Sequence, residues 1–202
     1  MVFVFAYQSG FDLEFFIVND GSDLDTSEYL REIDAAFEQI QLIENHENLG
    51  YTKSANLGLA AANSDYVVLL NSDVVVTPGW LQGLMQCMRT VPNCGVVGPL
   101  SNAASWQNVP QLFDEQGQFA VNTLPDQISI ESMAWWVRWL SSRKYPCVPF
   151  VNGFCLCLSR TVLETVGLFD EICFPRGYGE ENDYCLRVAK AGFNLAIADD
   201  VY

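Results

Sequence analysis

Acidic side chains stand at three places where an apolar run or a glycine-rich loop ends. Asp20 follows one apolar run, Asp73 follows another, and a third group opens an expected helix. Like charges that are brought together cost stability unless a cation or a proton offsets them. A carboxylate can bind a hard divalent cation or take a proton as a general base. The third group consists of Glu180, Glu181 and Asp183.

The run before Asp73 indicates how such a carboxylate is positioned. Residues 66–70 are apolar and partly β-branched, which predicts a strand that is buried on both faces of a sheet. In open α/β sheets, ligands bind beyond the carboxyl ends of such strands. Asp73 is therefore either a ligand at the rim of the sheet or a turn residue that accepts backbone hydrogen bonds.

Strand and helix patterns alternate along most of the chain, which predicts an α/β fold with a mostly parallel sheet. The alternation breaks over residues 101–149, where one helix is expected, and then returns. Thr77 fits a helix N-cap with Pro78 at the first helical position. Strands are expected at residues 14–18, 41–44, 66–70, 95–98, 150–158 and 194–198, and helices at 29–40, 52–62, 78–88, 129–142, just before 166, and 181–191.

The composition bounds the size of the protein and its partners. A chain of 202 residues that is 50% hydrophobic can bury one sizeable core. A net charge of −15 argues against a nucleic acid or an anionic membrane as the main partner. No apolar run approaches the roughly 18 residues that a transmembrane helix needs. Residues 1–7 are apolar but lack the basic flank of a signal peptide.

Cysteine usage indicates a reducing compartment. The seven cysteines are odd in number and form no CxxC pair. Cys155 and Cys157 stand two apart in an expected strand, so their side chains point to the same face. We interpret them as reduced core thiols, which are typical of a cytoplasmic protein.

Six segments, in the same order along the chain, resemble those of family 2 glycosyltransferases. One such match is weak, whereas six in order are specific. The resemblance implies a GT-A fold, in which a mostly parallel, Rossmann-like sheet is flanked by helices. It also implies inverting transfer of a sugar from a nucleotide diphosphate to an acceptor hydroxyl. The segments are VNDGSD (18–23), ENLGYTKSANLGL (47–59), DYVVLLNSDVVVTPGWL (65–81), GPLSNAAS (98–105), VNGFCLCLSRTVLETVGLFDE (151–171) and GYGEENDYCLRVAKAGF (177–193).

The resemblance also assigns roles by position. Asp20 matches the acid that binds the pyrimidine ring of the donor. Asp73 matches the last acid of the family's DxD motif, which holds Mg²⁺ or Mn²⁺ against the diphosphate, and Asn71 replaces the first acid. Glu181 matches the catalytic base, with Glu180 as the alternative.

Further residues match donor-binding or supporting positions. Lys53 could contact a phosphate, although a solvated helix lysine is the more ordinary interpretation. Asp183 and Arg187 could instead be a structural i,i+4 ion pair. The further residues at donor-binding positions are Ser72 and Lys53, and those at supporting positions are Asn152, Gly153, Asp183 and Arg187.

The family implies partners and a division of labour within one continuous domain. Residues 1–100 would bind a UDP-, dTDP- or GDP-sugar, and residues 101–202 would bind the acceptor and carry the base. The acceptor would be a carbohydrate or a lipid-linked molecule in cell-surface polysaccharide or glycan synthesis. We expect a hexosyltransferase that is cytoplasmic or peripheral at the inner face of the membrane. The tryptophans of the irregular segment form either an acceptor platform or core packing.

The resemblance is incomplete at both ends. Gln8 and Ser9 resemble the end of the family's first helix, so we expect the first strand to be absent. Residues 199–202 resemble the segment just before a histidine that often completes the metal and diphosphate site. We therefore expect a fold truncated at both ends, and a chain that by itself binds the donor weakly or not at all.

Two rival functions are consistent with parts of the pattern. A sugar-1-phosphate nucleotidyltransferase has a related sheet and metal-bound acids, but it should carry a glycine-rich, basic phosphate loop near its start. No such loop is present. A non-catalytic carbohydrate-binding or scaffold fragment would not need the three acidic sites together.

Overall fold

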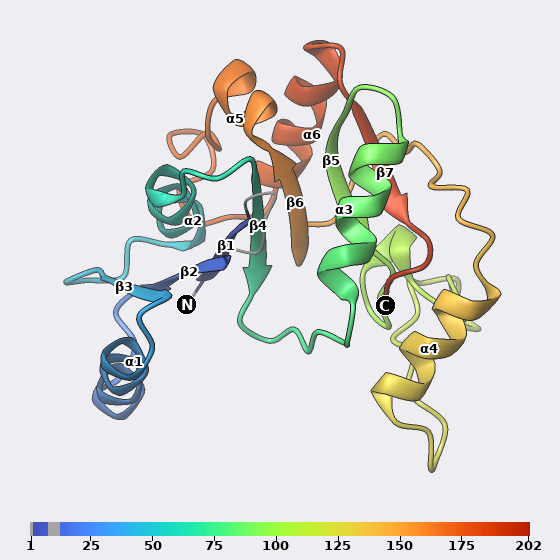
Figure 1. Cartoon of the computed structure of the whole chain (residues 1–202), viewed down its shortest axis with the longest axis horizontal. Helices are drawn as coiled ribbons and strands as arrows, with labels where there is room; N and C mark the ends of the chain where they lie inside the picture. Colours follow the sequence, from blue (N-terminus) through green and yellow to red (C-terminus); the bar gives the residue numbers. More distant parts are fainter. Residues whose placement is uncertain (1, 8–12) are drawn as a thin grey trace.

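The computed structural model describes residues 2–7 and 13–202. Its central feature is a seven-stranded sheet flanked by helices (Figure 1). The order of strands in the sheet is β3-β2-β1-β4-β6-β5-β7. The strands are β1 (Val2–Tyr7), β2 (Leu13–Asn19), β3 (Ile40–Glu44), β4 (Tyr66–Asn71), β5 (Cys94–Pro99), β6 (Cys155–Ser159) and β7 (Asn194–Ala198). The helices are α1 (Leu24–Ala36), α2 (Tyr51–Ala61), α3 (Trp80–Thr90), α4 (Ile130–Leu140), α5 (Arg160–Val166) and α6 (Glu180–Lys190), with a 3₁₀ turn, η1 (Ser105–Gln107).

The prediction of an α/β fold with helices flanking the sheet is confirmed, but the pairing is less parallel than predicted, since four of the six neighbouring pairs of described strands are antiparallel. Within the described residues, β2, β3, β4, β5 and β7 run in one direction, and β1 and β6 run in the other. Because the two reversed strands lie inside the sheet, each makes antiparallel pairs on both of its edges.

A strand, β1, precedes β2, although we expected the family's first strand to be absent. β1 lies between β2 and β4 and pairs antiparallel with both, with Val2 opposite Val18 on one side and Asn71 on the other. Its run of β-branched and aromatic residues favours such a position. The interpretation of Gln8 and Ser9 as a helix end lies outside the described residues.

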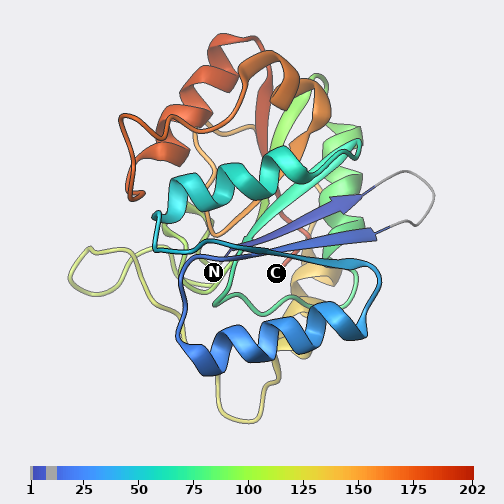
Figure 2. The same ribbon diagram turned by 90° about the vertical axis from the view of Figure 1, so that its left-hand side faces the viewer.

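Alternate residues of the central strands pack into two separate cores. On β4, Val67 and Leu69 face the core beneath α2, α5 and α6, while Val68 and Leu70 face the core beneath α3. Figure 2 shows α1 and α2 on opposite faces of the sheet. Because side chains alternate between the two faces of a strand, Cys155 and Cys157 lie together in the core beneath α3. Both are free, buried thiols, as predicted.

Three element boundaries differ from the prediction. α3 begins at Trp80 rather than Pro78, because Gly79 is in the left-handed region with φ of 81° and interrupts the helix. The hydroxyl of Thr77 donates instead to the carbonyl of Tyr202 at 2.7 Å. The strand expected at 150–158 begins only at Cys155, since the residues before it form a turn. The helix expected at 29–40 spans Leu24–Ala36, and Ile40 opens β3 instead.

The two predicted halves of the chain share one sheet. β6, from the second half, lies between β4 and β5 from the first half, and β7 extends the sheet beyond β5. The assignment of the halves to donor and acceptor stays a prediction. Among the described helices, none is long and apolar enough to cross a bilayer.

Candidate active site

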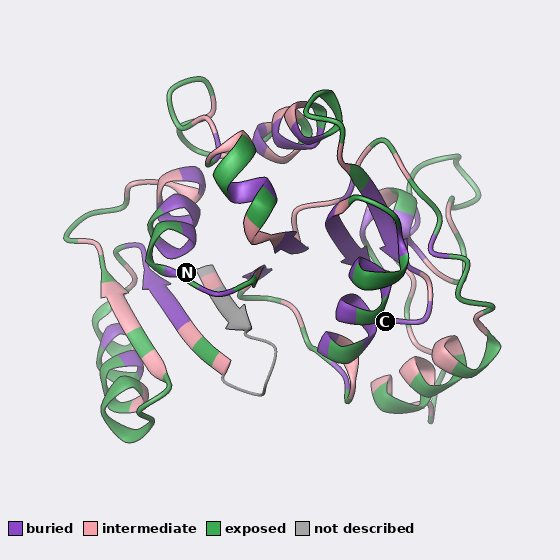
Figure 3. Cartoon of the chain, turned by 45° about the horizontal axis from the view of Figure 1, so that its top comes forward, coloured by how far each residue is buried: buried purple, intermediate pink, exposed green. Residues whose placement is uncertain are grey.

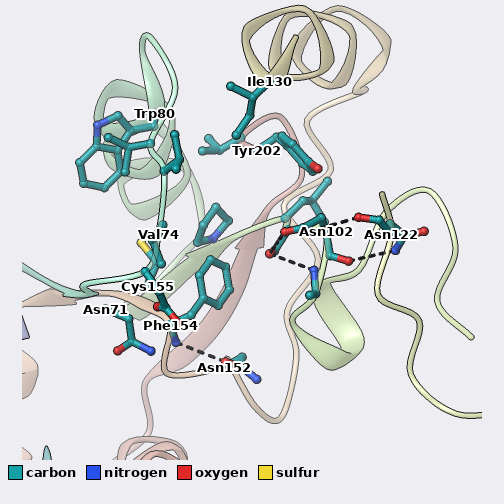
Figure 4. Close-up of a pocket in the computed structure, with 18 of the residues that line it drawn as sticks. Asn71, Val74, Trp80, Asn102, Asn122, Ile130, Asn152, Phe154, Cys155 and Tyr202 are labelled. Carbon is teal, nitrogen blue, oxygen red and sulfur yellow. Dashed lines mark hydrogen bonds between the residues drawn. The ribbon is translucent and has the colours of Figure 1, made fainter. Parts of the chain in front are cut away.

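A cavity of about 780 Å³ opens beyond the carboxyl ends of β4, β5 and β7 (Figure 4). Ligands of α/β sheets bind at such edges. Three of the predicted site residues line it, namely Asn71, Asp73 and Asn152. Its other walls are largely apolar and include Val74, Trp80, Leu100, Ile130, Phe154 and Tyr202.

Asn71 and Asp73 bring two kinds of oxygen to this cavity. The backbone N–H of Asn71 donates to the carbonyl of Phe154 at 3.0 Å, which holds the end of β4 against the turn before β6. The side-chain Oδ1 of Asn71 is buried and has no partner among the described residues. Asp73 is exposed at the cavity wall, and Ser72 is exposed outside the lining.

These two side chains suit a hard divalent cation whose coordination is completed by the substrate. No group of three or more His, Cys, Asp or Glu side chains within the described ranges could hold a metal by itself. Mg²⁺ is commonly held by one or two carboxylates together with substrate phosphates and water. The carboxylate of Asp73 and the unpartnered amide oxygen of Asn71 fit that pattern.

A buried glutamine that the sequence did not single out holds the Asn152 turn. Gln107 is 1% exposed, and its Oε1 accepts from the backbone N–H of Asn152 at 2.7 Å. Its Nε2 donates to the carbonyl of Pro99, so it ties the end of β5 to the same turn. Oδ1 of Asn152 accepts from the backbone of Phe154, which closes the turn. A buried Gln without a charged partner carries no sequence signal that could have identified this role.

Glu181 lies beside this turn. A Cβ added to Gly153 would stand 3.5–3.6 Å from the side-chain carbons of Glu181, so the glutamate packs against a residue without a side chain. The Sγ of Cys185 contacts the carbonyl of Val151 at 3.7 Å, which holds α6 to the same segment. The start of α6 therefore adjoins the cavity wall at Asn152.

Glu180 and Glu181 differ in their exposure. Glu180 is 5% exposed, whereas Glu181 is partly exposed, and each has an unpartnered buried Oε2 within the described chain. Burial, and then the charge of Glu181, raises the pKa of Glu180 to about 7. Burial and both glutamates also raise the pKa of Tyr51 above its ordinary value. Glu180 thus holds a proton at a pH where an ordinary glutamate has lost it.

Glu180→Gln should flatten the dependence of stability on pH. The pKa of Glu180 is raised from 4.5 to about 7, so the folded state binds its proton more tightly than the unfolded state. The free energy of unfolding therefore falls as pH rises between these values, by about 1–3 kcal/mol for this group. We expect the variant to lose that part of the slope in urea unfolding at pH 5 and pH 8. Glu164→Gln, an exposed glutamate on α5, is the matched control, and an equal change in both variants would contradict the assignment.

Asp20 is held by the loop that precedes α2. Its Oδ1 accepts from Asn45 and from the backbone N–H of Leu49, both at 2.8 Å, and its Oδ2 accepts from Gly50 at 3.0 Å. Burial acts to raise the pKa of Asp20, but these hydrogen bonds outweigh it and hold the pKa below its usual value. Asp20 does not line the main cavity. Its contact with a nucleotide base stays a prediction.

The start of α2 connects Asp20 to the loop before α6. A Cβ on Gly50, whose φ is 88°, would stand 2.6 Å from the carbonyl oxygen of Pro175, so this approach requires glycine. The hydroxyl of Thr52 donates to the carbonyl of Phe174. Lys53 lies half-buried in the first turn of α2 and makes no ion pair within the described residues.

Asp183 and Arg187 form the structural pair that was predicted as one alternative. Nε of Arg187 donates to Asp183 at 2.7 Å, and its other nitrogens donate to the carbonyls of Val166 and Leu168. These contacts hold α6 to the end of α5, and neither Asp183 nor Arg187 lines the cavity.

Of the two alternatives for the tryptophans of α4, the structure excludes core packing, and the acceptor platform stays a prediction. Trp135, Trp136 and Trp139 are 58%, 42% and 69% exposed. The tryptophan that does reach the cavity is Trp80, which the sequence placed only within a helix.

The sheet order, the flanking helices and the cavity beyond the strand ends match a GT-A fold. The crystal structure of GalNAc-T7 with UDP, GalNAc and Mn²⁺ superimposes with a TM-score of 0.68 at 16% sequence identity. That match covers 92% of this chain and 36% of the other.

Sequence comparison identifies the family. The profile described as Glycosyl transferase family 2 matches residues 5–135, so the chain belongs to this family. An uncharacterized protein of Mycobacterium tuberculosis is 30% identical over 161 residues, which cover 77% of this chain and 53% of that protein. The N-acetylglucosaminyl-diphospho-decaprenol L-rhamnosyltransferase of the same species is 29% identical over 184 residues, covering 78% and 55%. The chain thus spans about half the length of these relatives.

Proposed function

We propose that this protein transfers a sugar from a nucleotide-diphosphate sugar to an acceptor hydroxyl, with inversion at the anomeric carbon. The observation that carries the proposal is the cavity beyond β4, where Asn71, Asp73 and Asn152 meet and Glu181 lies next to the wall. The family membership supports the reaction class. The donor is a UDP-, dTDP- or GDP-sugar, and UDP is present in the GalNAc-T7 structure.

Asp73 and Asn71 are the residues that would hold Mg²⁺ or Mn²⁺. Such an ion, when bound, would neutralise charge that builds on the leaving diphosphate. Asp73 offers an exposed carboxylate at the cavity, and Asn71 offers an amide oxygen that no protein group satisfies in the described chain. Because an amide replaces the first acid, this end of the site carries less negative charge than a pair of acids would.

Glu181 is the proposed general base. It takes the proton of the acceptor hydroxyl while the acceptor oxygen bonds to the anomeric carbon and the bond to the diphosphate oxygen breaks. One displacement with one base gives inversion. Glu180 is the weaker candidate because it is 5% exposed and so less accessible to an acceptor hydroxyl, although its pKa of about 7 would itself suit a general base.

The apolar walls favour an acceptor with an apolar portion. Trp80, Phe154 and Tyr202 line the cavity, and aromatic faces pack well against both sugar rings and lipid chains. A lipid-linked acceptor in cell-surface polysaccharide or glycan assembly fits these walls, and the related rhamnosyltransferase is named for one. A location at the periphery of the inner membrane face fits the same acceptor.

Nucleotide release from a panel of UDP-, dTDP- and GDP-sugars tests the proposal. We expect release of the nucleoside diphosphate with Mn²⁺ or Mg²⁺ and none with EDTA, and a released sugar whose early anomeric configuration, by NMR, is inverted. Formation of a nucleotide sugar from a nucleoside triphosphate and a sugar 1-phosphate would instead indicate the rival nucleotidyltransferase. Binding of carbohydrate without any donor turnover would indicate a non-catalytic scaffold.

A further inference from the structure

The helix α4 presents an apolar face that no other described element covers. None of its residues is buried, and it carries no purple in Figure 3. Trp135, Trp139 and Leu140 are 58%, 69% and 72% exposed. The rings of Trp135 and Trp139 stack at 5.9 Å between centroids with an interplanar angle of 5°. Three of the protein's five tryptophans lie on this one helix.

Helical geometry gathers these side chains into a single stripe. At roughly 100° per residue, Trp135, Trp136, Trp139 and Leu140 fall within an arc of about 140°. Arg138 lies outside this arc, and its Nη2 donates to the carbonyl of Gly79 at 2.6 Å. That contact holds α4 to the start of α3 and leaves the apolar stripe facing outward.

Cationic side chains border the stripe. Arg138, Arg143 and Lys144 are three of the ten basic residues of a chain with a net charge of −15. A second cavity, of about 270 Å³, lies at this edge. It is lined by Trp135, Arg138, Trp139, Ser141 and Arg143.

The nearby acids are turned inward. Asp200 has a side chain that is 5% exposed and pairs at 2.9 Å with Arg143, whose side chain is 54% exposed. Asp199 accepts from the hydroxyl of Ser141 and from the backbone N–H groups of Lys144 and Tyr145. Glu131 is the one exposed acid on α4 itself, a turn or more before the tryptophans. Arg143 and Lys144 are therefore the outward-facing charges beside the stripe, although Arg143 is paired with Asp200 and the whole chain carries a net charge of −15.

We propose that α4 and the segment 141–144 dock the protein on the surface of a phospholipid bilayer. The four apolar side chains would enter the headgroup region, and Arg143 and Lys144 would face lipid phosphates. Amphipathic helices with Trp and Leu on one side and basic residues beside them bind membranes in this way. Eleven residues are too few to span a bilayer, which requires about 20.

A bilayer fits this surface better than a glycan does. The side chains of the stripe itself offer only indole N–H groups as hydrogen-bond donors, and Arg138 and Arg143 beside it already donate to Gly79 and Asp200, whereas a sugar site needs several polar partners for its hydroxyls. The position of α4 also matters, because Ile130 at its start lines the main cavity. Docking would bring the mouth of that cavity toward the bilayer.

Vesicle binding without any donor tests the proposal independently of the catalytic assignment. The probes are vesicles of phosphatidylcholine with and without phosphatidylglycerol, read by co-sedimentation and by tryptophan emission. We expect binding with a shift of emission to shorter wavelength. The double variant Trp135→Ala/Trp139→Ala should lower the partition coefficient about tenfold or more, since each indole contributes the burial of a large apolar side chain. Lys144→Gln should weaken binding only to vesicles with phosphatidylglycerol, and high salt should remove that difference.

Trp106→Ala is the matched control, because Trp106 is 63% exposed but belongs to η1 and packs with Phe113 and Phe119, and the binding of this variant should equal that of the unaltered protein. Leu140→Ser is a second variant on the stripe in case the double variant unfolds. The proposal is overturned if the unaltered protein does not bind vesicles or if the stripe variants bind as well as Trp106→Ala. Two other results without vesicle binding would also overturn it. One is a dimer in size-exclusion chromatography that the stripe variants abolish, and the other is a shift of tryptophan emission on adding free oligosaccharide.

Discussion

Glu181→Gln is expected to lower sugar transfer by about 10³-fold while donor affinity stays unchanged. Removing a general base costs about 10²–10⁴-fold in rate, because the acceptor hydroxyl then keeps its proton during attack. The loss corresponds to about 4 kcal/mol in the barrier. Steady-state rates of nucleotide release and calorimetric donor affinity, measured on the same preparation, separate the two effects.

Two further variants decide between the neighbouring glutamates. Glu164→Gln makes the same chemical change on the exposed surface of α5 and should leave the rate unchanged. Glu180→Gln should keep most of the activity, because the amide resembles the protonated form that its raised pKa favours. Full activity in Glu181→Gln together with loss in Glu180→Gln would move the base to Glu180.

Asp73→Asn is expected to weaken metal-dependent donor binding by about 10- to 100-fold. A charge-assisted interaction is worth about 1.5–3 kcal/mol, and each 1.4 kcal/mol is tenfold in affinity. Because Asp73 would act through the cation, the variant and the unaltered protein should bind donor equally in EDTA. Calorimetry with a UDP-sugar, with Mn²⁺ and then with EDTA, measures both differences.

The control for Asp73 lies at the other end of the same strand. Asp65 is an exposed aspartate just before β4, and Asp65→Asn removes the same charge far from the cavity. It should leave the dependence on Mn²⁺ intact. If Asp73→Asn binds donor as tightly as Asp65→Asn does in Mn²⁺, then Asp73 does not hold the metal.

The donor-binding experiment also bears on the expectation that this chain binds donor weakly. That expectation rested partly on a missing first strand, and β1 instead completes the sheet between β2 and β4. β4, the strand that ends at Asn71, is therefore paired with a neighbouring strand on each side. Micromolar binding of a donor sugar by this chain would contradict the weak-binding expectation.

Much of the fold was predictable because strand periodicity and burial are local signals. Residues 66–70 are apolar throughout, and the structure buries them in two cores on opposite faces. The end of that run predicted Asp73 at the rim of the sheet, where it lines the cavity together with Asn152. The place and direction of a strand in the sheet are not local signals, because they depend on its partners. β1, for example, pairs antiparallel with both β2 and β4.

Helix boundaries and exposure depended on contacts that no local pattern contains. Thr77 and Pro78 carry the signals of a helix start, but Gly79 adopts a left-handed conformation and Thr77 bonds to Tyr202. The tryptophans of α4 are apolar enough for a core, yet nothing in the described chain lies over them. Gln107 positions Asn152 through a contact 45 residues away in sequence.

The sequence by itself determined the family, the strands that end in polar residues and the set of acids available for chemistry. These follow from residue type and spacing, which act over a few positions. The resemblance favoured Glu181 over Glu180, but only the tertiary structure gave a physical difference between these two adjacent residues of identical type. One is buried and the other lies against Gly153 because α6 packs on the turn before β6, and that packing joins segments far apart in the sequence.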